Sequence, residues 1–175
     1  MQPKTSCIVT KPGKPSVSLD SFDIKLLSAL QENNQRTSEE LAGLVSLSPA
    51  ACLRRVKRLR DERVISADVS VVAPEALGQR MTMIVVVALE RDQQDLTDAF
   101  MASMRGTPQV TQCYYVTGQA DFVLVISVRD MDDYESFTRT FFAENRNVKR
   151  FDTMVVMKRA KFELGVKASV ALSGV

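Results

Sequence analysis

Residues 38–60 of this chain read SEELAGLVSLSPAACLRRVKRLR, and they decide the fold of its N-terminal part. A hydroxyl side chain, from Thr37 or Ser38, can cap a short helix at the start of this stretch. The apolar residues of that helix recur at helical spacing and are expected to face inward: Leu41, Leu44 and Val45. Ser48 followed by Pro49 gives an N-cap hydroxyl and a proline at the first helical position, which is typical of the start of another helix.

Outward from this stretch, two more segments complete the N-terminal part. An amphipathic helix is predicted over residues 19–33, where apolar side chains recur at helical spacing: Leu19, Phe22, Leu26 and Leu30. The helix that begins at Pro49 is expected to run to about Glu62, and residues 67–72 are expected to form a short extended segment. Three helices, of which the last two are joined by a tight turn and the last is basic, are typical of a helix-turn-helix domain.

The second half of the chain changes character, because strand patterns alternate there with helical ones. The predicted elements, in chain order, are a strand over 81–89, a helix from Asp92, strands over 109–117 and 121–129, a helix from Asp130, and a strand over 151–162. The resulting order is βαββαβ, which is typical of one antiparallel sheet with both helices on one of its faces. The expected fold class is therefore α+β: a three-helix, winged helix-turn-helix domain followed by a ferredoxin-like βαββαβ domain.

These elements predict two domains together with terminal and connecting segments. The predicted boundaries are a disordered tail over 1–18, a helix-turn-helix DNA-binding domain over 19–72, a linker over 73–80, a βαββαβ effector-binding and oligomerisation domain over 81–162, and a C-terminal tail over 163–175. The N-terminal tail contains three lysines and three prolines without apolar periodicity. It is therefore either an unstructured extension or a basic arm that adds phosphate contacts.

The strands over 81–89 and 121–129 contain nearly continuous apolar runs instead of alternating polar residues. A strand of that kind is buried on both of its faces. Since both helices are expected on one face of the sheet, the chain supplies no layer for the other face. A second subunit is the natural cover, so we expect a homo-oligomer.

The third predicted helix carries the charges that DNA binding requires. Five positive side chains and no acidic one lie within residues 54–60, on a chain whose formal net charge is only +2. At about 100° per residue, Val56 lies at the centre of an apolar face that includes Leu53, while Arg54 and Arg58 face directly away from it. The candidate DNA-binding residues are Ser48, Pro49, Ala50, Ala51, Arg54, Arg55, Lys57 and Arg58. Guanidinium groups pair with guanine edges in the major groove, and small residues allow close approach. A solvated basic face on an ordinary surface helix is the alternative.

Composition excludes several other classes of protein. The chain has no histidine, so the commonest general base and the commonest transition-metal ligand are both missing. Neither a nucleophile–base pair nor a metal cluster is recognisable, so we expect no enzyme activity, no metal and no cofactor. The three cysteines have no metal-like spacing, and no apolar run is long enough to cross a bilayer or resembles a secretory signal. This pattern favours a cytoplasmic protein with reduced thiols and no membrane partner.

Several short motifs occur in order along the chain. In the first half they are Leu19-Asp20…Asp23, Glu40-Leu41-Ala42, Leu47-Ser48-Pro49…Arg54-Arg55-Val56-Lys57-Arg58-Leu59 and Val64-Ile65. In the second half they are Cys113-Tyr114…Val116-Thr117-Gly118…Asp121-Phe122 and Val155-Val156-Met157. With this order and spacing, residues 19–162 resemble the Lrp/AsnC (feast/famine, leucine-responsive regulator) family of transcription regulators.

The resemblance implies a regulator that binds double-stranded DNA and dimerises through its βαββαβ domain. In the family, dimers often build octamers, and an amino acid commonly binds between dimers near the turn that matches residues 117–121. Carried over to this chain, the candidate effector-binding residues are Thr117, Gly118, Gln119, Ala120 and Asp121. Independently of the family, a short turn with glycine can expose backbone N–H groups to a carboxylate, and Asp121 can balance an α-amino group. A plain β-hairpin turn is the alternative.

Two positions depart from the family's usual sequence. Ser46 and Arg63 stand where the family usually has glycine, in the helix–helix turn and before the pair Val64-Ile65. Both positions are expected to need a left-handed backbone, which costs a residue other than glycine roughly 1 kcal/mol. We expect the motif to survive with a strained or slightly reshaped turn, and Arg63 to be able to contact a phosphate.

Two other functions fit parts of the pattern. RNA-recognition domains share the βαββαβ order, but the strand that would carry their stacking aromatics has only Phe122. A metabolite-binding module whose basic helical arm docks a protein partner is the alternative to a DNA-binding regulator. The slope of log affinity against log salt on duplex DNA distinguishes the two, because phosphate contacts release counterions.

Overall fold

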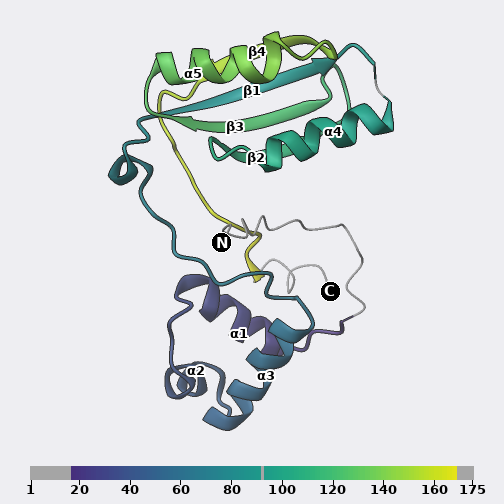
Figure 1. Ribbon diagram of the computed structural model, residues 1–175. Coiled ribbons are helices and arrows are strands. Elements are labelled where there is room, and N and C mark those ends of the chain that lie inside the picture. The colour runs from purple at the N-terminus through teal and green to yellow at the C-terminus, as the bar shows by residue number, and fades with distance from the viewer. Residues whose placement is uncertain (1–16, 92, 169–175) are drawn as a thin grey trace, which may run out of the picture. The chain divides into compact units, whose positions relative to one another are not determined.

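The computed structural model describes residues 17–91 and 93–168 (Figure 1). These residues divide into two compact units. The first unit holds residues 17–70 together with 161–168, and the second holds the rest. Most of the predicted N-terminal tail, and the predicted C-terminal tail beyond Ala168, lie outside the described residues.

The first unit contains three helices, as the periodicity predicts: α1 (Ser21–Glu32), α2 (Ser38–Val45) and α3 (Pro49–Asp61). Each begins with a side chain that satisfies free N–H groups of the first turn. Asp20 caps α1 in a capping box with Asp23, and Thr37 caps α2 in the same way. Ser48 caps α3, and Pro49 occupies its first turn.

The core of this unit joins all three helices. Its buried residues are Leu26, Ala29, Leu41, Val45, Cys52 and Val56. Two leucines that the helical spacing assigns to the inner side are exposed instead, Leu44 by 53% and Leu53 by 62%. The expectation for both was wrong, because each helix is covered by only two others and buries a narrower stripe than its apolar residues span.

Both positions at which glycine is usual have the expected left-handed backbone. Ser46 has a φ of 58° and Arg63 a φ of 57°, so this prediction is confirmed. The N–H of Ser46 still bonds to the carbonyl of Ala42 at 3.0 Å, and that of Arg63 to the carbonyl of Arg60 at 3.0 Å. The helix-turn-helix geometry is therefore kept, with a strain of roughly 1 kcal/mol at each residue.

Two segments of this unit differ from the sequence expectations. Residues 67–72 form no strand within the described part of the chain, because the unit offers no other strand as a partner, so the expected wing is not formed there. Residues 161–168 lie on this unit, although a tail was expected from residue 163. The side-chain amide of Gln31 on α1 donates to the carbonyl of Val166 and accepts from the N–H of Ala168, both at 2.8 Å.

The second unit is a four-stranded antiparallel sheet with helices packed on it (Figure 1). Its elements are η1 (Pro74–Leu77), β1 (Met81–Leu89), α4 (Gln94–Arg105), β2 (Val110–Tyr115), β3 (Phe122–Val128), α5 (Met131–Thr138), η2 (Arg139–Ala143) and β4 (Val148–Val155). The strand order is β2-β3-β1-β4, so the predicted βαββαβ order and the α+β class are confirmed. The last strand ends earlier than predicted, because β1, the strand that it pairs with, begins at Met81.

One core lies between the sheet and both helices. Alternate residues of the central strands are buried, such as Val85 on β1 and Leu124 on β3. They pack in a single cluster with Phe100 from α4 and Phe137 from α5. Both helices therefore cover the same face of the sheet, as the topology predicts.

The opposite face of the sheet is apolar on its central strands, β1 and β3, and only half-buried, while the edge strands add polar residues to it, such as Gln112 on β2 and Asp152 on β4. Val86 on β1 faces Val123 on β3, and Val123 faces Tyr114 on β2, so that the three side chains form a row across the sheet. Ile84 and Val125 pair in the next row. Tyr114 is 52% exposed, and no second layer covers these rows within the described residues of this unit. The apolar open face expected from the sequence is present.

Candidate nucleic-acid interface

The outer face of α3 is defined by what its inner face buries. Cys52, Val56 and Leu59 are at most 4% exposed, and they anchor the helix in its unit. Arg54 and Lys57 lie away from this face and are exposed, and they form no ion pair or side-chain hydrogen bond with any described residue. Both cations are therefore available to an anionic ligand.

Arg55 and Arg58, in contrast, have partners on α1. One carboxylate oxygen of Asp23 accepts from Nη1 of Arg55 at 2.8 Å, and the other accepts from Nη2 of Arg58 at 2.5 Å. Nη1 of Arg55 also donates to Asp20 at 2.8 Å. The Asp23 side chain is 1% exposed, whereas those of Arg55 and Arg58 are 28% and 42% exposed. This group of four residues, the Asp23 cluster, ties α3 to α1.

The Asp23 cluster corrects the expectation that Arg58 faces directly away from the core. The prediction counts Leu53 as buried. It therefore centres the apolar face of α3 on Val56 and places Arg58 on the opposite side of the helix. Leu53 is exposed, so the buried stripe is turned toward the side of Arg55, and Arg58 lies closer to this stripe than Arg54 does. Arg54 keeps its outward position, whereas Arg58 reaches back to Asp23.

Charges within the Asp23 cluster stabilise one another. The backbone N–H of Asp23 and the guanidinium of Arg55 hold the pKa of Asp20 below its ordinary value. The hydrogen bonds that Arg55 donates to Asp23 and Asp20 raise the pKa of its guanidinium. Asp20 and Arg55 therefore both stay charged at neutral pH, and the cluster is an ion-pair network.

The remaining cations near the end of α3 divide in the same way. Arg60 pairs with Asp68 at 2.9 Å, so three of the five cations within residues 54–60 are neutralised inside the unit. Arg63, directly after the helix, is exposed and has no partner among the described residues. The positive charge available to DNA is thus smaller than the sequence suggests, and it is concentrated on Arg54, Lys57 and Arg63.

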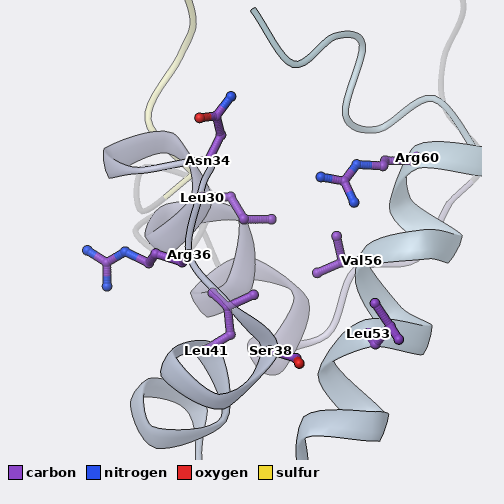
Figure 2. Close-up of a pocket in the computed structure, with 8 residues that line it drawn as sticks. All are labelled: Leu30, Asn34, Arg36, Ser38, Leu41, Leu53, Val56 and Arg60. Carbon is purple, nitrogen blue, oxygen red and sulfur yellow. The ribbon is translucent and has the colours of Figure 1, made fainter.

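A shallow pocket lies between α1, α2 and α3 (Figure 2). The residues that line it are Leu30, Asn34, Arg36, Ser38, Leu41, Leu53, Val56 and Arg60. Its two arginines already have carboxylate partners, Arg36 in Glu32 and Arg60 in Asp68. Leu53 lines the pocket while most of its surface remains exposed.

The turn that is expected to bind an effector joins β2 to β3. Gly118 has a φ of 125°, a conformation that residues with a side chain rarely adopt. The carboxylate of Asp121 accepts from the N–H of Leu89 at 2.6 Å, and the N–H of Asp121 donates to the carbonyl of Val87 at 2.9 Å. Asp121 therefore fixes the turn to the end of β1 with one carboxylate oxygen. Its other oxygen has no partner among the described residues.

Sequence reasoning missed the structural role of Asp20 and Asp23. Their places at the N-cap and in the first turn of α1 indicate a capping box, which the structure contains. Nothing in the local sequence points to Arg55, 32 residues away from Asp23. Among the described residues there is no group of three or more potential metal ligands, and no helix long and apolar enough to cross a membrane.

Both halves of the chain match known domains. A model of the AsnC-type helix-turn-helix domain matches residues 19–60, and a model of the Lrp/AsnC ligand binding domain matches residues 82–166. The chain belongs to the Lrp/AsnC family of transcription regulators. The resemblance is confirmed, and this Lrp/AsnC regulator combines a DNA-binding domain with a ligand-binding domain and is not an enzyme.

Relatives of this Lrp/AsnC regulator match over most of its length. The HTH-type transcriptional regulator y4tD of Sinorhizobium fredii is 53% identical over 89% of this chain and 92% of its own. A leucine-responsive regulatory protein of Haemophilus influenzae is 34% identical over 85% of this chain and 89% of its own. Among solved structures, a transcriptional regulator of Neisseria meningitidis in complex with L-Met is 32% identical, with a TM-score of 0.80 over 85% of this chain and 96% of its own. These matches favour the DNA-binding regulator over the protein-docking module.

Proposed function

We propose that this regulator reads duplex DNA with α3 in the major groove. The residues that we assign to this contact are Ser48, Pro49, Ala50, Ala51, Arg54, Arg55, Lys57 and Arg58. One observation carries the assignment: Arg54 and Lys57 are exposed on the outside of a helix whose inner side is fully buried, and they have no partner among the described residues. Guanidinium and ammonium groups in that position suit guanine edges and phosphates.

These residues have different roles in the proposed contact. Ala50 and Ala51 are small enough for the start of α3 to approach base edges. Arg54 and Lys57 donate to DNA directly. Arg55 and Arg58 act first through the Asp23 cluster, as positioning residues that hold α3 at a fixed angle. Arg58 is still 42% exposed and can also neutralise a phosphate.

We also propose that the effector is an amino acid bound at residues 117–121. The match to a ligand-binding domain and the L-Met complex of the Neisseria relative support this class of ligand. Backbone N–H groups of the turn at Gly118 suit a carboxylate, and the unpartnered oxygen of Asp121 suits an ammonium group. Thr117, Gln119 and Ala120 would complete the site.

The proposed assembly is a homodimer built on the open face of the sheet, with octamers formed from dimers. The apolar rows on β1 and β3, which Tyr114 of β2 extends, support the dimer, because a half-buried apolar face of this kind marks an interaction surface. The DNA target implies that the protein works in the compartment that holds the chromosome, which for a bacterial cell is the cytoplasm. Light scattering on the purified chain measures the assembly directly, and a monomer at micromolar concentration would contradict it.

DNA reading is tested on a site selected from a pool of randomised duplexes. Arg54→Ala and Lys57→Ala are each expected to weaken binding to that site by about 1–3 kcal/mol. The matched control is Arg139→Ala, which removes an arginine that is 68% exposed on the second unit, outside the proposed contact. If both α3 variants keep the wild-type circular dichroism and the wild-type affinity, the assignment is wrong.

The effector is identified by a separate screen of the twenty amino acids in a thermal-shift assay. A ligand that binds the native state raises its melting temperature. At least one amino acid is expected to do so in the full chain. If none does, the amino-acid proposal fails, and the DNA assignment is unaffected.

A further inference from the structure

Leu53 is an apolar side chain on the part of α3 that otherwise carries charge. It is 62% exposed, while the other large apolar residues of the helix, Val56 and Leu59, are at most 4% exposed. Leu53 contributes to the rim of the shallow pocket beside α3 (Figure 2), but most of its surface is free. The core therefore does not account for a leucine at this position.

The position of Leu53 relative to its neighbours is fixed by the helix. Ala50 lies three residues before it and Lys57 four residues after it, so the three side chains follow one another along the same side of α3. Arg54 is the next residue, and it borders this row on the other side. Ala50 is exposed as well and adds no bulk at the start of the row. A ligand that approaches this side of α3 therefore contacts the apolar side chain of Leu53. The methyl group of Ala50 lies before it, and the cations of Arg54 and Lys57 lie beside and after it.

The major groove of DNA presents one prominent apolar group, the 5-methyl group of thymine. We propose that Leu53 is a specificity-determining residue that recognises thymine by packing against this methyl group. The inference rests on the proposed insertion of α3 into the major groove. In that arrangement Arg54 and Lys57 supply the polar and phosphate contacts, and Leu53 supplies a contact that carries sequence information without a hydrogen bond.

The test removes the methyl group from the DNA and the leucine from the protein in one cycle. A site is first selected from randomised duplexes with the wild-type chain, and each thymine in it is then replaced singly by deoxyuridine. Burial of one methyl-sized group contributes about 0.8 kcal/mol, which corresponds to about fourfold in affinity. When one particular thymine of each half-site is replaced by deoxyuridine, we expect the affinity of the wild-type chain to fall about fourfold. The affinity of Leu53→Ala is expected not to change on the same replacement.

Leu44→Ala is the matched control, since Leu44 is an exposed leucine on α2 of the same unit. It is expected to keep the full deoxyuridine effect. Leu53→Asn gives an independent readout, because asparagine pairs with adenine in the major groove. A selection repeated with this variant is expected to replace thymine by another base at the same position.

Four outcomes would contradict the proposals. If wild type is insensitive to deoxyuridine at every thymine, or if Leu53→Ala keeps the wild-type sensitivity, Leu53 does not read thymine. If Leu53→Asn selects the same base as wild type, the inference is overturned as well. If no duplex is enriched at all, the proposed DNA reading by α3 itself fails, which separates that failure from failure of the role of Leu53.

Discussion

Asp23→Asn removes the charge on which Arg55 and Arg58 converge while it keeps the size of the side chain. The carboxylate accepts the two guanidinium groups at 2.8 Å and 2.5 Å and is 1% exposed. An asparagine offers only one oxygen, so its NH₂ group must face one of the two arginines as donor against donor. The substitution therefore loosens α3 from α1 without creating a cavity.

The size of the effect follows from the exposure of the partners. A hydrogen bond to a charged group contributes about 1.5–3 kcal/mol. The arginines are 28% and 42% exposed and regain water when they are released, so the loss is smaller than two such bonds. We expect the free energy of unfolding of the first unit to fall by about 2–4 kcal/mol. Replacing both arginines by methionine leaves the buried carboxylate unpaired, and this change is expected to cost about 3–5 kcal/mol.

Hydrogen exchange measured on peptides from α3 follows this unit separately from the sheet. Asp61→Asn is the control, because Asp61 is an exposed carboxylate on the same helix with no partner among the described residues. It is expected to change the stability by less than about 0.5 kcal/mol. If Asp23→Asn also lowers the stability by less than about 0.5 kcal/mol, the reasoning is refuted. It is refuted as well if the variant with both arginines replaced by methionine loses less stability than Asp23→Asn.

Four further predictions address the interface, the backbone, a thiol and the effector turn. Removing Arg54 and Lys57 together is expected to reduce the slope of log affinity against log salt by about 2 for each subunit that contacts the DNA, since each phosphate contact contributes about 0.9; an unchanged slope would exclude phosphate contacts. Ser46→Gly is expected to raise the free energy of unfolding by up to about 1 kcal/mol in urea titrations, because it relieves the strain of a positive φ. Burial raises the pKa of Cys113, so in a variant with its other two cysteines replaced by serine, alkylation at pH 8 should be slower than for a free cysteine and should accelerate only as pH rises further. Asp121→Ala is expected to lose about 1 kcal/mol of stability with the bond to Leu89, and to keep the operator affinity while it loses the response to the amino acid found by thermal shift.

The apolar pattern predicts the three helices and the βαββαβ order because burial of one face imposes the period of the element. The resemblance to the family also predicts the backbone conformation at Ser46 and Arg63, since glycine is usual at both positions and both residues have a positive φ here. The end of β4 is different. Apolar residues continue past Val155, but the strand stops where its pairing partner begins at Met81. The length of a strand depends on its neighbour, and that information is not local.

At the candidate interface, the positive charge available on the surface is smaller than the positive charge in the sequence. Five cations within residues 54–60 predict a face for a polyanion, but three of them end on carboxylates of the same unit: Arg55, Arg58 and Arg60. Leu53 is the converse, an apolar residue that counts as core in a helical wheel and lies outside. Both errors have one origin, because a wheel gives directions around the helix axis but not which neighbour lies in each direction. Among the described residues of α3, the exposed side chains that the fold leaves without an ion pair include Ala50, Leu53, Arg54 and Lys57. A surface with two cations beside small and apolar groups suits contacts to base edges in the major groove. It suits binding to the phosphate backbone alone less well.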